Sequence, residues 1–218
     1  MGSNLNLNYQ IEEYINSHSI KLHPVQYEII KYNETLGEIK KMQISISQCH
    51  FLHLIVKIIK PKNILEIGTF TGLSALTMGL AMDENSKLTA LDKNKETSDV
   101  AISFFKKAKI DNKINLLINN AIVSLDDLNN QKKKFDFIFI DADKENYINY
   151  FNNSLNILNN NGIIVVDNVL WYGDVADQNK NDRLTLKIRE FNKFIKDDNR
   201  VESLILPIGD GLSVCRKK

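Results

Sequence analysis

Residues 63–72 of the 218-residue chain read NILEIGTFTG, and this stretch decides the fold. Its first half is apolar, which is typical of a short buried strand. Gly68 then predicts a tight turn, and Gly72 precedes a run, residues 73–81, that we expect to be helical. In an open parallel sheet such a turn lies at the carboxyl ends of the strands, where these sheets bind their ligands.

Two familiar nucleotide-binding loops do not fit this turn. A dinucleotide fingerprint of the form G-x-G-x-x-G needs a second glycine two positions after Gly68, but Phe70 stands there. A P-loop needs Gly-Lys followed by Ser or Thr, but Gly72 is followed by Leu73 and Ser74. The turn therefore belongs to neither class.

Segments with strand and helix patterns alternate along the rest of the chain. The expected strands are residues 87–92, 114–118, 135–141 and 163–167, and the expected helices are 96–108, 123–128, 147–158 and 184–196. Apolar strands alternating with helices predict a mostly parallel sheet covered by helices on both faces. Residues 201–206 and 212–215 flank a Gly-Asp-Gly turn typical of a hairpin, so the last strand is predicted to be antiparallel.

The segment before the first strand is expected to consist of helices. Residues 9–21 have helical spacing, and Pro24 is suited to the first turn of a second helix. Ser45 or Ser47 is expected to cap a third helix, which Pro61 stops. No linker or repeat divides the sequence, so we expect one domain over residues 1–218.

The composition limits the compartments and the partners that we expect for this protein. The chain has 28 basic and 27 acidic residues, a formal charge of +1, so no global field favours a polyanionic partner. Cys49 and Cys215 fit neither a disulfide framework nor a metal knuckle, which is consistent with a reducing compartment. No continuous apolar run approaches the roughly 20 residues of a membrane helix, and no signal-peptide pattern is present. We therefore expect a cytoplasmic protein.

Acidic side chains gather where the predicted strands end. Asp92, Asp141 and Asp167 each end a strand, and Glu66 lies near the end of another. Adjacent strands are about 4.8 Å apart, so carboxylates at neighbouring ends can converge on one ligand. An acid that ends the second strand, here Asp92, is well placed to accept hydrogen bonds from a ribose diol.

Asp141, Asp167 and Asn168 together offer three oxygen ligands without histidine or thiolate. Such a set suits a hard cation, with Mg²⁺ the first choice and Ca²⁺ or Mn²⁺ as alternatives. The other reading is that these acids merely cap helices or turns. The presence of Lys144 and Trp171 in the same two segments favours the functional reading.

Four motifs carry a family resemblance. Residues 66–74 (EIGTFTGLS), 141–147 (DADKENY), 167–173 (DNVLWYG) and 206–212 (LPIGDGL) resemble motifs of the cation-dependent caffeoyl-CoA/catechol O-methyltransferase family. This family is a branch of the class I S-adenosylmethionine-dependent methyltransferases, and the resemblance spans about residues 23–216. It implies a Rossmann-like α/β fold with a mostly parallel seven-stranded sheet and an antiparallel C-terminal strand.

The resemblance also implies roles for individual residues. S-adenosylmethionine would be bound by Met42, Glu66, Gly68, Thr69, Ser74, Asp92, Ala121 and Asp141. The divalent cation would be held by Asp141, Asp167 and Asn168. Lys144 and Asp141 would be catalytic, with Lys144 as the base, and Lys144 and Trp171 would border the acceptor.

The implied activity is cation-dependent methyl transfer to a hydroxyl of a catechol-like aromatic small molecule by a homodimer. The helices of residues 1–60 would cover the acceptor site or form the dimer interface. Residues 175–191 form a shorter segment than in plant members, so the chain looks more like the bacterial members. Two alternatives stay open: methylation of a hydroxylated wobble uridine in tRNA, and a non-catalytic or NAD-binding Rossmann-like module.

Overall fold

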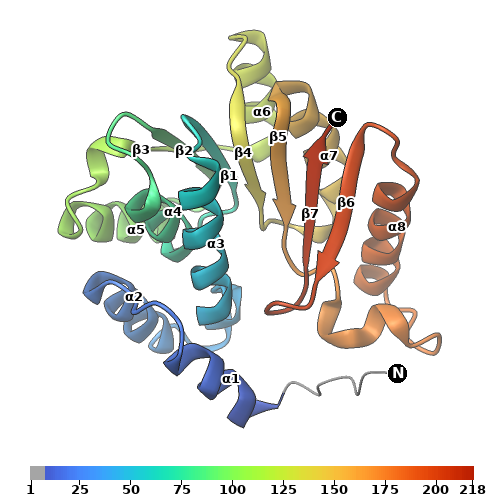
Figure 1. Cartoon of the computed structure of the whole chain (residues 1–218), viewed down its shortest axis with the longest axis horizontal. Helices are drawn as coiled ribbons and strands as arrows, with labels where there is room; N and C mark the ends of the chain where they lie inside the picture. Colours follow the sequence, from blue (N-terminus) through green and yellow to red (C-terminus); the bar gives the residue numbers. More distant parts are fainter. Residues whose placement is uncertain (1–7) are drawn as a thin grey trace.

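A computed structural model describes residues 8–218, so residues 1–7 of the predicted domain lie outside the described part. Its strands form one sheet in the order β3-β2-β1-β4-β5-β7-β6 (Figure 1). The strands are β1 Asn63–Ile67, β2 Lys87–Asp92, β3 Ile114–Ile118, β4 Phe135–Ile140, β5 Leu158–Val166, β6 Val201–Leu206 and β7 Leu212–Lys217. The pairs from β3 to β5 are parallel, and β7 runs antiparallel to both neighbours, which confirms the predicted fold class.

The central strands are apolar because helices cover both of their faces. In β4, residues 137–140 are all fully buried, and Ile64 of β1 pairs in register with Phe137. Strands buried on both faces have no solvent side, so they read as continuous apolar runs rather than alternating ones. This explains why the sequence pattern identified β1 and β4 so clearly.

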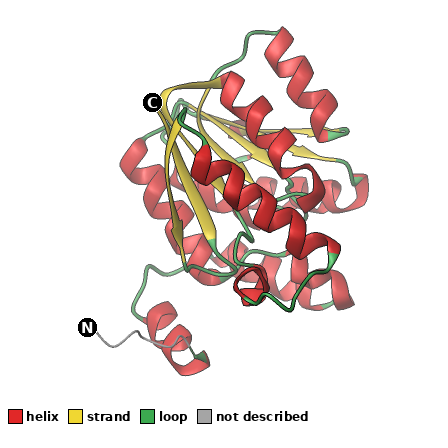
Figure 2. Ribbon diagram, turned by 90° about the vertical axis from the view of Figure 1, so that its right-hand side faces the viewer, coloured by secondary structure: helices red, strands yellow, loops and turns green. Residues whose placement is uncertain are grey.

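Two apolar cores lie on opposite faces of the sheet (Figure 2). The helices are α1 Tyr9–Ser17, α2 Pro24–Glu34, α3 Ile46–Ile59, α4 Leu73–Ala81, α5 Lys95–Lys107, α6 Ala121–Asn130, α7 Tyr147–Ile157 and α8 Arg183–Asp197. Helices α2 to α5 enclose one core, and α6 to α8 enclose the other. Both faces of the sheet are thereby removed from water, which is the main source of stability in such a fold.

The N-terminal helices begin where the sequence predicted, but α1 ends at Ser17, earlier than the predicted residues 9–21. Of the two candidate caps of α3, Ser45 is the one used: its hydroxyl accepts from the backbone N–H of Gln48, and the Gln48 side chain accepts in return from Ser45. Lys60, in the left-handed region, ends α3 before Pro61. An unpredicted 3₁₀ helix, η1 Gly37–Met42, follows α2. Helix α1 has no buried residue and projects from the body (Figure 1).

The helical stretch Gly37–Ile59 is long and apolar enough to cross a membrane by length and composition. This was not anticipated from the sequence, where no continuous apolar run of that length occurs. The stretch is two helices, however, because Gln43 and Ser45 have extended backbone between η1 and α3. Leu52 and Val56 of α3 are buried in the core shared with α4.

One strand boundary was predicted wrongly. Strand β5 begins at Leu158, directly after α7, whereas the sequence predicted a strand over residues 163–167. The pairing of β5 with β4 shifts register between Phe135 and Phe137, so the early part of β5 is irregular. Asn161 adopts a positive φ of 63°, which asparagine tolerates better than most residues.

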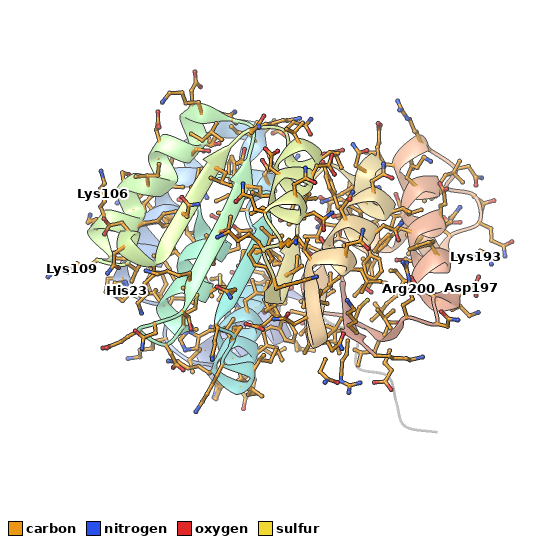
Figure 3. All side chains as sticks on the ribbon, turned by 90° about the horizontal axis from the view of Figure 1, so that it is seen from above. His23, Lys106, Lys109, Lys193, Asp197 and Arg200 are labelled. Carbon is orange, nitrogen blue, oxygen red and sulfur yellow. The ribbon has the colours of Figure 1, made fainter. Side chains whose placement is uncertain are left out.

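Charged side chains cover both flanks of the molecule, including strands β6 and β7 at one edge of the sheet, where Arg216 pairs with Glu202 at 2.8 Å. Viewed from above, Lys106 and Lys109 lie at one side of the molecule, while Lys193, Asp197 and Arg200 lie at the other (Figure 3). Lys193 and Asp197 form an exposed ion pair of 2.6 Å along α8. Such exposed pairs are weak in stability terms, so replacing Lys193 should leave the fold intact.

Candidate active site

A cavity of about 1300 Å³ opens where β1, β2, β4 and β5 end. Its lining includes the residue that follows or ends each of these strands, namely Gly68, Asp92, Asp141 and Asp167. The order of the sheet reverses between β1 and β4, and open α/β sheets bind ligands at this switch point. The cavity is therefore the candidate active site.

The turn after β1 is shaped by the neighbouring strand. Gly68 has a φ of 89°, and a β-carbon there would lie only 1.9 Å from the backbone oxygen of Asp141. The sequence predicted a tight turn at Gly68, and the structure shows why glycine is needed there, namely the close approach of another strand's backbone. Phe70, where the dinucleotide fingerprint has its second glycine, also has a positive φ, of 50°.

Asp92 is fixed against this turn. Its Oδ2 accepts hydrogen bonds from the backbone N–H of Thr69 (2.9 Å) and of Phe70 (2.7 Å), and its Oδ1 accepts from that of Asn94 (2.8 Å). The carboxylate is thus held in one orientation while it lines the cavity. An ionised carboxylate has about four acceptor positions, so acceptor capacity remains for a ribose diol.

Glu66 lies beneath the cavity rather than in its lining. The side chain is fully buried, and neither carboxylate oxygen has a hydrogen-bond partner. Burial raises the pKa of Glu66 to about 8, while the nearby hydroxyls of Ser74 and Thr69 oppose the rise without forming a hydrogen bond of normal geometry. An unpaired buried carboxyl is costly, which is typical of a group that serves a ligand.

Asp167 and Asp141 bring two carboxyl groups to the same part of the cavity. Asp167 is 2% exposed, and its pKa is raised to about 8, first by burial and then by the charge of Asp141. Its Oδ1 accepts from the backbone N–H of Asn168 at 2.6 Å. Asp141 lies 3.1 Å from the ammonium group of Lys144. The site therefore concentrates negative charge that one lysine only partly balances.

Asn168 is oriented by a residue that the sequence analysis did not assign to the site. Its backbone has a φ of 55°, and its Nδ2 donates to Oδ2 of Asp210 at 3.5 Å. The amide oxygen is thereby left to face other partners. Asp210 belongs to the Gly-Asp-Gly turn, which the sequence analysis gave as a hairpin signal and as part of a family motif without a site role, and it lines the cavity.

Lys144 is largely buried, with 13% of its side chain exposed, and its Nζ lies 5.1 Å from the centre of the Tyr147 ring. Burial alone would lower the pKa of Lys144, but Tyr147 and then Asp141 outweigh it and hold the pKa above its usual value. The side chain therefore carries its positive charge at neutral pH. Tyr147, also missed from the sequence, donates its hydroxyl proton to the backbone oxygen of Asp167 at 2.9 Å.

Gln48 is a third unpredicted residue of this region. It is 3% exposed, lines the cavity, and has no hydrogen-bond partner for its Nε2. A β-carbon at Gly209 would lie 2.6 Å from its carboxamide, so the side chain fits closely against the β6–β7 turn. Its interaction with the Asp167 carboxylate lowers the pKa of that group, against the larger effect of burial.

The predicted site residues converge in the structure, with one exception. All of them except Glu66 line the cavity: Met42, Gly68, Thr69, Ser74, Asp92, Ala121, Asp141, Lys144, Asp167, Asn168 and Trp171. Within residues 8–218 no cluster of three or more His, Cys, Asp or Glu side chains could hold a metal ion. The predicted cation set contains two carboxylates and one amide, and so is not a cluster of that kind.

Comparison with known proteins identifies the family to which this fold belongs. The O-methyltransferase family model matches residues 16–218. The O-methyltransferase from Bacillus cereus, solved in complex with SAH, superposes with a TM-score of 0.88 at 29% identity and covers 96% of this chain and 97% of its own. The fold is that of an S-adenosylmethionine-dependent methyltransferase.

Two further relatives are similar to most of this chain. A caffeoyl-CoA O-methyltransferase of Populus kitakamiensis is 35% identical over 189 residues, covering 83% of this chain and 80% of its own length. A flavonoid 3',5'-methyltransferase of Vitis vinifera is 36% identical over 185 residues, covering 81% and 79%. The chain belongs to the O-methyltransferase family, and it is an enzyme that uses S-adenosylmethionine.

Proposed function

We propose that this enzyme methylates a hydroxyl of a catechol-like aromatic small molecule with the help of a divalent cation, Mg²⁺ being the best suited. The observation that carries the proposal is the carboxyl pair of Asp141 and Asp167 in the cavity, which Asn168 also lines. Vicinal hydroxyls are a chelating group, so an acceptor of this class matches such a site.

The donor set fits a hard cation. Asp167 is buried, and the charge of Asp141 contributes to its raised pKa, so the two carboxyl groups repel each other. A dication would offset this repulsion, and two carboxylates with an amide oxygen are the ligands Mg²⁺ prefers. When bound, the cation would lower the pKa of an acceptor hydroxyl and fix its position.

Lys144 contributes a positive charge next to this set. Since its pKa is raised, we assign it first to stabilising the ionised acceptor oxygen, and the role of base that the sequence suggested becomes secondary. Asp141 holds the ammonium group at 3.1 Å, and the Tyr147 ring supports it from 5.1 Å. The chain thus orients the charge by packing as well as by ion pairing.

The methyl donor would occupy the side of the cavity formed by the turn after β1. Asp92 would accept from the ribose, Ser74 and the backbone of Gly68 and Thr69 would hold the amino-acid end, and Ala121 would border the adenine. Glu66, which is buried beneath this turn without a hydrogen-bond partner, would also serve the donor. Alignment of donor and acceptor is the main contribution such a site makes to rate.

Aromatic side chains support an aromatic acceptor. Trp171 and Tyr172 line the cavity with ring centres 5.6 Å apart, and Tyr172 is 75% exposed at its edge. The relatives named above act, by their names, on caffeoyl-CoA and on flavonoids, both of which are aromatic. A flat ring with adjacent hydroxyls is the acceptor we infer for this chain.

The proposal is tested by methyl transfer from labelled S-adenosylmethionine to a small catechol panel, with Mg²⁺ and then with EDTA. EDTA-sensitive turnover supports it. Turnover that persists in EDTA would contradict the cation, and no turnover on any catechol, while SAH still binds, would contradict the acceptor class. In the second case tRNA becomes the substrate to examine.

We also propose that the enzyme acts as a homodimer, with the exposed side of α3 in the interface. Leu54 and Ile58, one helical turn apart on α3, are 59% and 68% exposed. Two large aliphatic side chains on one exposed stripe suit a second copy of the chain better than water. A dimer mass in light scattering that falls to a monomer mass in Ile58→Asp would support this; a monomeric wild-type chain would contradict it.

A further inference from the structure

The cavity wall after β5 has an unusual backbone. The segment of residues 169–177, here termed the acceptor wall, contributes Trp171, Tyr172, Gly173 and Val175 to the cavity lining. Its 3₁₀ helix, η4 Trp171–Ala176, is interrupted because Trp171, Tyr172 and Gly173 have φ values of 48°, 55° and 88°. Each left-handed residue other than glycine costs of the order of 1–3 kcal/mol, so this shape persists only if other contacts impose it.

One end of the acceptor wall is held by the β6–β7 turn. The backbone oxygen of Asp210 accepts from the N–H of Leu170 at 2.9 Å, and its Oδ1 accepts from the N–H of Tyr172 at 2.5 Å. From α8, Nδ2 of Asn192 donates to the backbone oxygen of Val169 at 2.8 Å. The turn that orients Asn168 therefore also holds this end of the acceptor wall in place.

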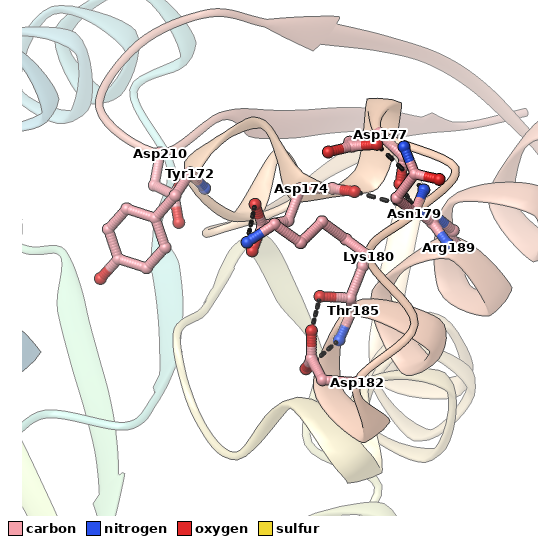
Figure 4. A network of polar contacts seen from close by, with 9 residues as sticks. All are labelled: Tyr172, Asp174, Asp177, Asn179, Lys180, Asp182, Thr185, Arg189 and Asp210. Carbon is pink, nitrogen blue, oxygen red and sulfur yellow. Dashed lines mark hydrogen bonds and ion pairs between the residues drawn. The ribbon is translucent and has the colours of Figure 1, made fainter.

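The other end is held by a single side chain of α8, Arg189 (Figure 4). Its Nε donates to the backbone oxygen of Val175 at 3.0 Å, and its Nη2 donates to those of Asp174 at 2.8 Å and Asp177 at 2.5 Å. Its Nη1 reaches the side-chain oxygen of Asn181 at 3.2 Å. Three carbonyl groups of an irregular loop thus converge on one guanidinium.

Arg189 holds backbone carbonyl groups in place instead of forming an ion pair. Across the described residues 8–218, no carboxylate forms a salt bridge with it, and the nearby Asp174 carboxylate pairs instead with Lys180 at 3.8 Å. A guanidinium presents donors in a fixed planar fork, whereas a lysine ammonium is a compact point charge on a flexible stem. Lysine at this position would lack the fork whose separate nitrogens reach Val175, Asp174 and Asn181 at once.

We propose that Arg189 is a positioning residue for the methyl acceptor. By fixing the carbonyls of residues 174, 175 and 177, it sets where Trp171 and Val175 stand against the cavity, at a distance from the turn that serves the methyl donor. The inference rests on the proposed function in that it takes this wall to be the acceptor side. It predicts that loss of the fork impairs acceptor binding and spares donor binding.

The test compares Arg189→Lys and Arg189→Gln with the matched control Lys193→Gln, an exposed position on the same helix. For 3,4-dihydroxybenzoate as acceptor, we expect KM to rise about tenfold or more in both Arg189 variants, since misplacing a substrate-positioning group by about 1 Å can cost up to a hundredfold. The Kd of SAH by calorimetry should stay within about twofold of wild type, and the control should match wild type in both.

A second readout does not depend on the acceptor. Trp171 is the one tryptophan of the chain, so its fluorescence reports on the acceptor wall alone. Acrylamide quenching should increase in both Arg189 variants and stay unchanged in Lys193→Gln. If wild type turns over no catechol, the proposed function fails while quenching still decides the role of Arg189. Unchanged Trp171 quenching, or SAH affinity that falls in parallel with acceptor affinity, would overturn the inference.

Discussion

A β-carbon at Gly68 would lie 1.9 Å from the backbone oxygen of Asp141. This relationship joins the donor-binding turn after β1 to the proposed cation ligand after β4. The two strands pair in parallel up to Ile67 and Ile140, and the backbone N–H of Asp141 donates to the oxygen of Ile67 at 2.8 Å. The position of Asp141 therefore depends on the absence of a side chain at residue 68.

Replacing this glycine tests the relationship. Gly68→Ala should lower the melting temperature by several degrees and weaken SAH binding strongly, because the methyl group collides with backbone that cannot rotate away. Gly37→Ala is the matched control, since Gly37 also has a positive φ but has no atom within 4 Å of its absent β-carbon. The control carries only the left-handed cost, about 1–2 kcal/mol. Equal effects of the two substitutions would contradict the collision.

Asp92 provides a test of the donor side. Asp92→Asn removes the charge that accepts from the backbone of Thr69 and Phe70, so the turn loses charge-assisted hydrogen bonds. We expect SAH affinity to fall roughly tenfold to a hundredfold, the equivalent of about 1.5–3 kcal/mol. Calorimetry with SAH measures this, and Asp99→Asn, an exposed ion-pair residue on α5, is the control. Unchanged SAH affinity would exclude Asp92 from the donor site.

Glu66 predicts how stability depends on pH. Its pKa is raised from 4.5 to about 8 in the folded protein, so folding favours the protonated form. This contribution to stability is fully present below pH 4.5 and is lost as the pH rises to about 8. Glu66→Gln should therefore flatten the decline in melting temperature over this range in the ligand-free protein. A decline that is the same in both proteins would show that another group causes it.

Much of the fold could be predicted from the sequence because its central strands, such as β1 and β4, are buried on both sides. Residues 87–92 and 114–118 were predicted with the bounds that the structure shows, as was helix α4. The start of β5 could not be predicted, because it depends on contacts with β4: Leu158 pairs with Phe135, and the Asn159 side chain donates to Oδ1 of Asp136 at 2.7 Å. These contacts join segments more than 20 residues apart and have no local sequence signature.

The candidate site likewise contains residues that could be predicted from the sequence and residues that could not. Asp92, Asp141 and Asp167 could be found because each follows a recognisable strand. Gln48 and Arg189 could not, because each acts through contacts between segments far apart in the chain: Gln48 against the turn at Gly209, and Arg189 against the carbonyls of the acceptor wall. A capping glutamine and a helix-surface arginine have no sequence signature for such roles.

The measurement that tests the central claim most directly is the Mg²⁺ dependence of methyl transfer to 3,4-dihydroxybenzoate in wild type and in Asp167→Asn, with Asp99→Asn as control. We expect saturable activation by Mg²⁺ in wild type and in the control, and a loss of at least about a hundredfold in Asp167→Asn, with SAH affinity retained within a few-fold. Full Mg²⁺-dependent activity in Asp167→Asn would contradict the assignment of the buried carboxyl pair to the cation.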